Sequence, residues 1–100
     1  MLEAARTANE FAANLTIRDY LENMLLRSGI ERQLEIIGEA AGKVSPEFRG
    51  AYPDIPWKKI IAQRNVIAHE YGEIKQELIW MVVKQSIPEL IDKLKPLVSE

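Results

Sequence analysis

Apolar residues recur at the three- and four-residue spacing of an α-helix in four stretches of this 100-residue sequence. The expected core stripes are Leu2, Ala5, Ala8, Phe11, Ala12 and Leu15; Ile30, Leu34, Ile37, Ala41 and Val44; Trp57, Ile60, Ile61, Ile67, Ala68 and Tyr71; and Ile79, Val83, Ile87, Leu90, Leu94 and Leu97. Such side chains share one helix face, which must be buried against another element. No segment shows a convincing strand pattern. The pattern predicts an all-α fold in one domain, residues 1–100: an up-and-down bundle of four main helices plus short connecting helices.

Capping residues, prolines and glycines mark where these helices begin and end. Thr16 and Ser45 suit helix N-caps, because a hydroxyl can accept a free N–H of the first turn. Gly72 can take the left-handed conformation that ends a helix. Pro88 lacks an N–H and should bend the last helix. The predicted helices span residues 2–15, 17–22, about 23–44, 46–52, 56–72 and about 75–98.

Composition excludes several classes of site. The chain has no cysteine and one histidine, so disulfides, thiolate metal sites and cysteine nucleophiles are ruled out, and we expect no metal and no cofactor. Glycine-rich phosphate loops and serine elbows are also missing. No apolar run approaches the roughly 20 residues that span a bilayer, so a cytoplasmic protein without a membrane partner is expected. A net charge of -2 leaves room only for a local nucleic-acid contact.

Two glycines in the long predicted helix favour close packing. Gly38 and Gly42 lie one turn apart, beside Ala40 and Ala41. A glycine inside a helix costs roughly 0.5 to 1 kcal/mol relative to alanine, so a structural reason is expected. Close approach of another backbone is one interpretation, and fraying toward a C-terminal cap is the other.

The stretch RNVIAHEYG, residues 64–72, concentrates the polar side chains best suited to chemistry and contains the only histidine. On a helical wheel Arg64 falls inside the apolar stripe, where a guanidinium must either reach solvent or find a partner. Glu39 and Glu35 are the expected partners. Asn65 and His69 share the flanking edge, one turn apart, with Lys58 on the same side.

Each of these residues also has a plain structural interpretation. Arg64 could be only the member of an ion pair, and His69 only a surface group that favours the C-terminal helix dipole. Tyr71 could be a core residue with its hydroxyl at the edge, and Asn65 a solvated edge residue. Their clustering around a charge in the apolar stripe favours a functional site.

The segment RNVIAHEY matches the R-N-x-x-x-H-x-Y signature of HEPN domains, and the surrounding sequence resembles their HepT-like branch. GEAA in the long helix, PDIPW at the entry to the motif helix and LIWMVVKQSIPEL in the last helix extend the similarity over residues 32–94. The resemblance implies a homodimeric, metal-independent ribonuclease, the toxin of a toxin–antitoxin pair, with tRNA or mRNA among the candidate substrates. The expected partner is an MNT-type nucleotidyltransferase, which can modify the tyrosine at the position of Tyr71 with adenylate.

The residues support RNA cleavage on chemical grounds as well. RNA carries its own nucleophile, the 2′-hydroxyl, so cleavage needs a base, an acid and charge stabilisation at phosphorus, without a metal. His69, with an ordinary pKa of about 6.5, suits both proton roles near neutral pH. Arg64 can stabilise the phosphate as a bidentate donor. Asn65 and Tyr71 are supporting candidates. One histidine per chain gives two-fold pairing a mechanistic reason.

Basic residues near the motif helix form a candidate RNA-holding rim. Lys58, Lys59 and Arg49 lie close in sequence to Tyr52 and Trp57. The alternative is a solvated charged face. A second hypothesis for the whole protein is a non-catalytic dimeric module that binds a nucleotide or the nucleotidyltransferase.

Overall fold

Helices connected by short turns make up the part of the chain that the computed structural model describes, residues 1–69 and 75–98, with only the backbone of His69 included. No strand occurs within these ranges, which confirms the predicted all-α class. The α-helices are α1 (Leu2–Ala12), α2 (Ile17–Glu22), α3 (Met24–Gly42), α4 (Pro46–Ala51), α5 (Trp57–His69), α6 (Gln76–Met81) and α7 (Ile87–Leu94). A π turn, η1 (Val82–Ser86), joins α6 to α7, and a 3-10 turn, η2 (Lys95–Leu97), follows.

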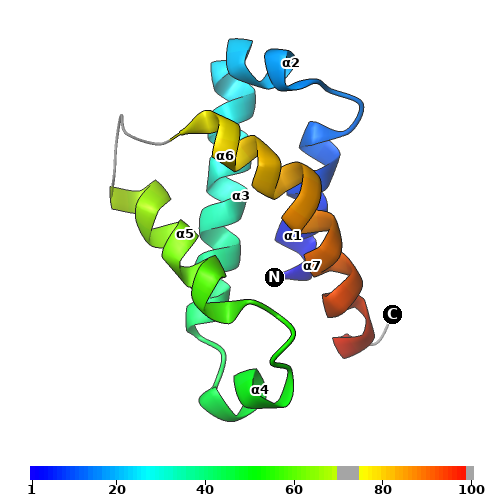
Figure 1. The fold of residues 1–100 in the computed structure, drawn as a ribbon, viewed down its shortest axis with the longest axis vertical. Helices are drawn as coiled ribbons and strands as arrows, with labels where there is room; N and C mark the ends of the chain where they lie inside the picture. Colours follow the sequence, from blue (N-terminus) through cyan, green and yellow to red (C-terminus); the bar gives the residue numbers. More distant parts are fainter. Residues whose placement is uncertain (70–74, 99–100) are drawn as a thin grey trace.

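Helix α3 organises the bundle, because α5 packs along one of its sides and α1 along another (Figure 1). Helix α7 packs against α1. The molecule measures 41 × 29 × 17 Å, with α2 and α4 at opposite ends of the long axis. The motif helix α5 therefore takes its position mainly from α3.

The predicted stripes form most of the core. Ile30, Leu34, Ile37 and Ala41 of α3 are buried, as are Ile79, Val83, Ile87, Leu90 and Leu94 of the last helical segment. Phe11 was expected in the core, but 41% of its surface is exposed. Its ring lies beside Gly29 of α3 instead, where a Cβ would come within 3.3 Å of Phe11 Cε2.

The short helices begin where their caps predict. Thr16 Oγ1 accepts the N–H of Asp19 at 3.2 Å, while Asp19 Oδ2 accepts the N–H of Thr16 at 2.9 Å, a reciprocal capping box. These hydrogen bonds lower the pKa of Asp19. Ser45 Oγ accepts the N–H of Phe48 at 3.1 Å and starts α4. Asn23 caps α3.

The helices differ from the prediction in three places. Helix α3 ends at Gly42 rather than at about Val44. The first helix ends at Ala12 rather than Leu15, because Ala13 is extended and Asn14 has a φ of 60°. Asparagine tolerates this left-handed conformation, which stops a helix. The predicted continuous helix over 75–98 is interrupted by η1, where the N–H of Ile87 bonds to Val82 O. Pro88 has no N–H to donate in the following helical hydrogen bond. The predicted change at this proline therefore takes the form of a widened π turn just before it.

A polar contact ties α2, α3 and α6 together at the other end of the molecule. The hydroxyl of the buried Tyr20 donates to Gln76 Oε1 at 2.6 Å, and Gln76 Nε2 donates to Glu31 Oε1 at 2.9 Å. Burial and the nearby Glu31 carboxylate raise the pKa of Tyr20. This contact holds the start of α6 against the rest of the bundle.

Candidate active site

Arg64 lies where α5 crosses α3, directly over Gly38. A Cβ added at Gly38 would come within 2.7 Å of Arg64 Cγ, closer still to Arg64 Cβ, and within 3.3 Å of the Ile60 carbonyl oxygen. The close-packing interpretation is confirmed for Gly38. It is wrong for Gly42, where an added Cβ meets nothing within 4 Å. Gly42 is the last residue of α3, as the end-of-helix interpretation predicts. The missing side chain at Gly38 thus makes room for the stem of Arg64.

The Arg64 guanidinium emerges beside a row of acidic residues on α3. Arg64 Nη2 lies 3.9 Å from Glu39 Oε1, and the Arg64 side chain is 31% exposed. Glu39 was one of the two expected partners; the other, Glu35, pairs with Arg32 instead, at 3.4 Å. Arg32 also reaches Glu39 Oε1 at 3.5 Å, so Glu39 is shared between two arginines.

Arg64 is also linked to its neighbour on α5. Its Nη1 donates to Asn65 Oδ1 at 3.4 Å, a long hydrogen bond, while its Nε is buried without a partner. Partly exposed ion pairs contribute little to stability, typically about 0–1 kcal/mol. The guanidinium is therefore oriented by weak contacts and keeps donors that a phosphate could engage.

His69 is the last residue of α5, and its backbone continues the helix one turn beyond the exposed Asn65. Helix geometry, at about 100° and 1.5 Å per residue, puts Lys58, Asn65 and His69 along one edge of α5. The side chain of His69, and the whole of Tyr71 and Gly72, lie outside the described residues. The geometry of the imidazole and of the tyrosine hydroxyl stays a prediction.

The three basic rim candidates border one open hollow, between α4 and the start of α5. Its volume is about 500 Å³, and Arg49, Lys58 and Lys59 line it together with the mainly apolar Gly50, Pro53, Ile55, Pro56 and Trp57. Both lysines are exposed. The structure thus brings together residues that the sequence associated only by proximity, while an RNA contact there stays a prediction.

Arg49 has a structural task that the sequence analysis missed. Its Nη2 donates to the carbonyl oxygens of Ala41 and Gly42, at 3.0 and 3.1 Å, at the end of α3. Basic side chains often satisfy the last carbonyls of a helix, so an arginine shortly after a predicted helix end was the available signal. Its charge is partly committed to α3, which leaves Lys58 and Lys59 as the freer cations of the hollow.

The described residues contain no group of three or more histidine, cysteine, aspartate or glutamate side chains that could hold a metal ion. Within the same part of the chain, no helix is long and apolar enough to cross a membrane.

The HEPN signature predicts a helical domain that carries an arginine, an asparagine and a histidine on one helix. The structure has this arrangement on α5. The comparison with known families agrees: the model of the HepT-like family, described as "Ribonuclease HepT-like", matches residues 1–97. The chain belongs to this family of the HEPN superfamily.

Relatives from several microorganisms carry ribonuclease names. A protein of Methanocaldococcus jannaschii called "Putative RNase" is 34% identical over 90 residues, which are 90% of this chain and 83% of the relative. "Probable ribonuclease HepT" of Thermococcus cleftensis is 32% identical over 95% of this chain and 86% of its own length. A "Putative RNase" of Caldanaerobacter subterraneus is 32% identical over 91% and 81%, respectively. No solved structure matches the chain at a comparable level of significance.

Proposed function

We propose that this protein is a cytoplasmic, metal-independent ribonuclease that acts as the toxin of a toxin–antitoxin pair. The observation that carries the proposal is the close packing of the Arg64 side chain against Gly38. This packing leaves a partly exposed guanidinium on α5, the helix that ends in His69. Membership of the HepT-like ribonuclease family supports RNA as the substrate.

Cleavage follows from these groups without a metal. The 2′-hydroxyl oxygen attacks the adjacent phosphorus, so a new P–O bond forms while the bond from phosphorus to the 5′-oxygen breaks, leaving a cyclic phosphate. A neutral imidazole takes the 2′-hydroxyl proton, and a protonated imidazole gives a proton to the leaving oxygen. Arg64 stabilises the extra negative charge on the phosphate oxygens. Asn65 orients a phosphate oxygen or the imidazole, and Tyr71 supplies a hydrogen bond or stacks on a base.

A homodimer completes this mechanism. The chain has a single histidine, whereas the reaction uses one base and one acid. Two-fold pairing that places two copies of His69 at one cleft would supply both. The proposed antitoxin is an MNT-type nucleotidyltransferase, which would block the site by adding adenylate to Tyr71. Co-expression with this nucleotidyltransferase should raise the mass of the protein by one adenylate, and Tyr71→Phe should prevent the increase.

The decisive experiment measures RNA cleavage by the purified protein in EDTA, free of any partner. Wild type should cut, and His69→Ala should lower the rate by roughly 10²- to 10⁴-fold, the usual contribution of a general acid or base. Circular dichroism and sedimentation should show unchanged helicity and assembly. Cleavage by His69→Ala at the wild-type rate would remove the proposal.

A second candidate function is a non-catalytic dimeric module that binds a nucleotide or the nucleotidyltransferase. The contacts of Arg64 with Glu39 and Asn65 favour it, because they also suit a purely structural arginine. In that case wild type would never cut RNA but would bind ATP or the partner. A third possibility is that Arg64 is only an ion-pair member; Arg64→Ala would then reduce the free energy of unfolding, and His69→Ala would be silent in every functional assay.

A further inference from the structure

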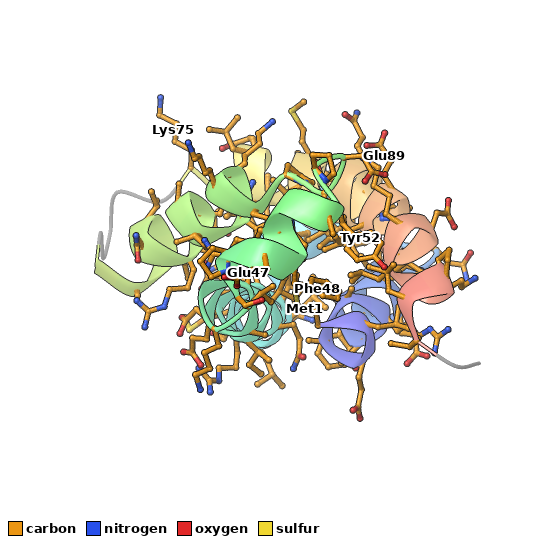
Figure 2. The ribbon with its side chains drawn as sticks, turned by 90° about the horizontal axis from the view of Figure 1, so that it is seen from below. Met1, Glu47, Phe48, Tyr52, Lys75 and Glu89 are labelled. Carbon is orange, nitrogen blue, oxygen red and sulfur yellow. The ribbon has the colours of Figure 1, made fainter. Side chains whose placement is uncertain are left out.

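The hollow between α4 and α5 has walls that are fixed by contacts outside it. Trp57 Nε1 donates to the Tyr52 carbonyl oxygen at 3.0 Å, which holds the connecting loop to the start of α5. The ring of Phe48 packs on those of Tyr52 and Trp57, with centroids 4.7 and 6.3 Å apart. Figure 2, the view from the α4 end, shows Phe48 and Tyr52 close together.

The loop is held from two further sides. Lys93 Nζ donates to the Asp54 carbonyl oxygen at 2.8 Å, which ties the loop to α7, and Arg49 ties α4 to the end of α3. A site whose walls are held in this way is largely formed before a ligand arrives, which lowers the cost of binding.

The lining suits a ligand that is flat and apolar on one side and negatively charged on the other. The exposed Pro53 and Pro56 supply apolar surface, and the exposed Lys58 and Lys59 supply positive charge at the start of α5. A nucleotide has this combination, with its base for the apolar surface and its phosphate for the lysines. Sites for single-stranded nucleic acid pair positive charge with flat side chains, usually aromatic, on which bases stack. In the hollow, the two proline rings would take that place.

The hollow also lies in line with the proposed cleavage site. Lys58 precedes Asn65 by two helical turns, so the two residues share one edge of α5 and lie roughly 10 Å apart along the axis. An RNA strand that follows this edge would pass from the hollow to Asn65 and His69.

We propose that the hollow binds a nucleotide of the RNA substrate that lies beyond the cleaved bond, with its base on the prolines and its phosphate on Lys58 and Lys59. This inference rests on the proposed function for the identity of the RNA, but it concerns binding and not cleavage. It assigns the hollow a role in choosing which RNA segment enters the site.

A plugging variant tests the hollow without changing its charge. Gly50 lines the hollow, and a Cβ added there meets nothing within 4 Å, so Gly50→Leu should fill the space without disturbing the fold. Gly42→Leu is the matched control, because Gly42 is equally open but does not line the hollow. The probe is a labelled single-stranded 2′-O-methyl RNA, which cannot be cut because its nucleophile is blocked, and the readout is fluorescence anisotropy.

We expect Gly50→Leu to weaken binding of this RNA by roughly 5-fold or more, as for the loss of one base contact. Lys58→Ala and Lys59→Ala should weaken it as well and reduce its salt dependence. Gly42→Leu and Arg18→Ala should bind as wild type does; Arg18 is an exposed cation on α2, at the opposite end of the molecule (Figure 1).

The outcomes separate this inference from the proposed function. Wild-type affinity in Gly50→Leu, equal losses in both glycine variants, or no binding of the RNA by wild type would overturn the inference. If Gly50→Leu alone loses affinity while wild type never cuts RNA, the hollow stands and the ribonuclease proposal fails. Competition with ATP distinguishes an RNA strand from a free mononucleotide as the ligand of the hollow. Tighter binding of free ATP than of the RNA would assign the hollow to a mononucleotide and overturn the RNA assignment.

Discussion

Gly38 determines where the Arg64 side chain lies, and Glu39 lies next to its guanidinium. The backbone of Gly38 lies against its Cβ and Cγ, while Glu39, the next residue of α3, lies 3.9 Å from Nη2. Arginine inside an apolar stripe is costly unless its charge leaves the core. Here the stem is buried and the guanidinium reaches the surface, so a residue that would be a misfit in a core becomes available to a phosphate.

At the residue scale, Glu39→Gln should lower RNA cleavage by about 10-fold, because Arg64 loses the charged partner that orients its guanidinium. Glu35→Gln is the control, since Glu35 pairs with Arg32. Urea unfolding should show changes below about 1 kcal/mol for both variants, as for other partly exposed pairs. Equal effects of the two changes on cleavage would argue against an orienting role for Glu39.

Helices α3 and α5 approach each other closely enough that their separation depends on one missing side chain. Gly38 is buried at the crossing, whereas Gly42, one turn later, is exposed. The two glycines look equivalent in the sequence, yet only the first bears on how α5 is held. The distance between the two helices in turn determines how far the Arg64 side chain lies from the backbone of α3.

At the element scale, Gly38→Ala should destabilise the protein by about 1–3 kcal/mol, because overpacking forces α3 and α5 apart. Gly42→Ala should be neutral or slightly stabilising, since alanine is the better helix former and its Cβ enters open space. Urea unfolding of the two variants measures the difference. Equal stability of both variants would mean that the crossing can relax around a methyl group.

The whole chain supplies a single imidazole, whereas the proposed cleavage reaction has two proton transfers. Within one protomer α5 is packed on α3 and ends in His69, so the bundle itself brings no second histidine to the helix. The proposed homodimer places the missing group on another copy of the chain.

At the molecular scale, mixing tests whether a cleft needs both copies of His69. Compared with pure wild type at the same total protein concentration, a refolded one-to-one mixture of wild type and His69→Ala should show roughly one quarter of the activity, because only wild-type pairs would be complete. On the same scale, independent protomers would show about half of the activity of pure wild type. Sedimentation of the mixture checks that the variants pair equally well, and a linear loss would show that each chain works alone.

The amino-acid pattern carried most of the secondary structure and the identity of the candidate site. Apolar spacing placed α3 and α5, and the hydroxyls of Thr16 and Ser45 marked two helix starts, because these signals depend on neighbours within a few residues. The motif residues Arg64, Asn65 and His69 could be named for the same reason. The early end of α1 at Ala12, two residues before the left-handed Asn14, and the π turn before Pro88 depend on local backbone choices that several sequences would permit.

Only the tertiary structure decided which residues meet across helices. The sequence left Glu35 and Glu39 equal as partners of Arg64, and it left Gly38 and Gly42 equal as points of close approach. It also could not show that the Arg49 guanidinium donates to a carbonyl oxygen at the end of α3, or that Lys58 and Lys59 border a hollow. Periodicity fixes the face of a helix, but the crossing of α3 and α5 fixes which turn of that face meets the neighbouring helix, and that choice arises from packing over the whole bundle.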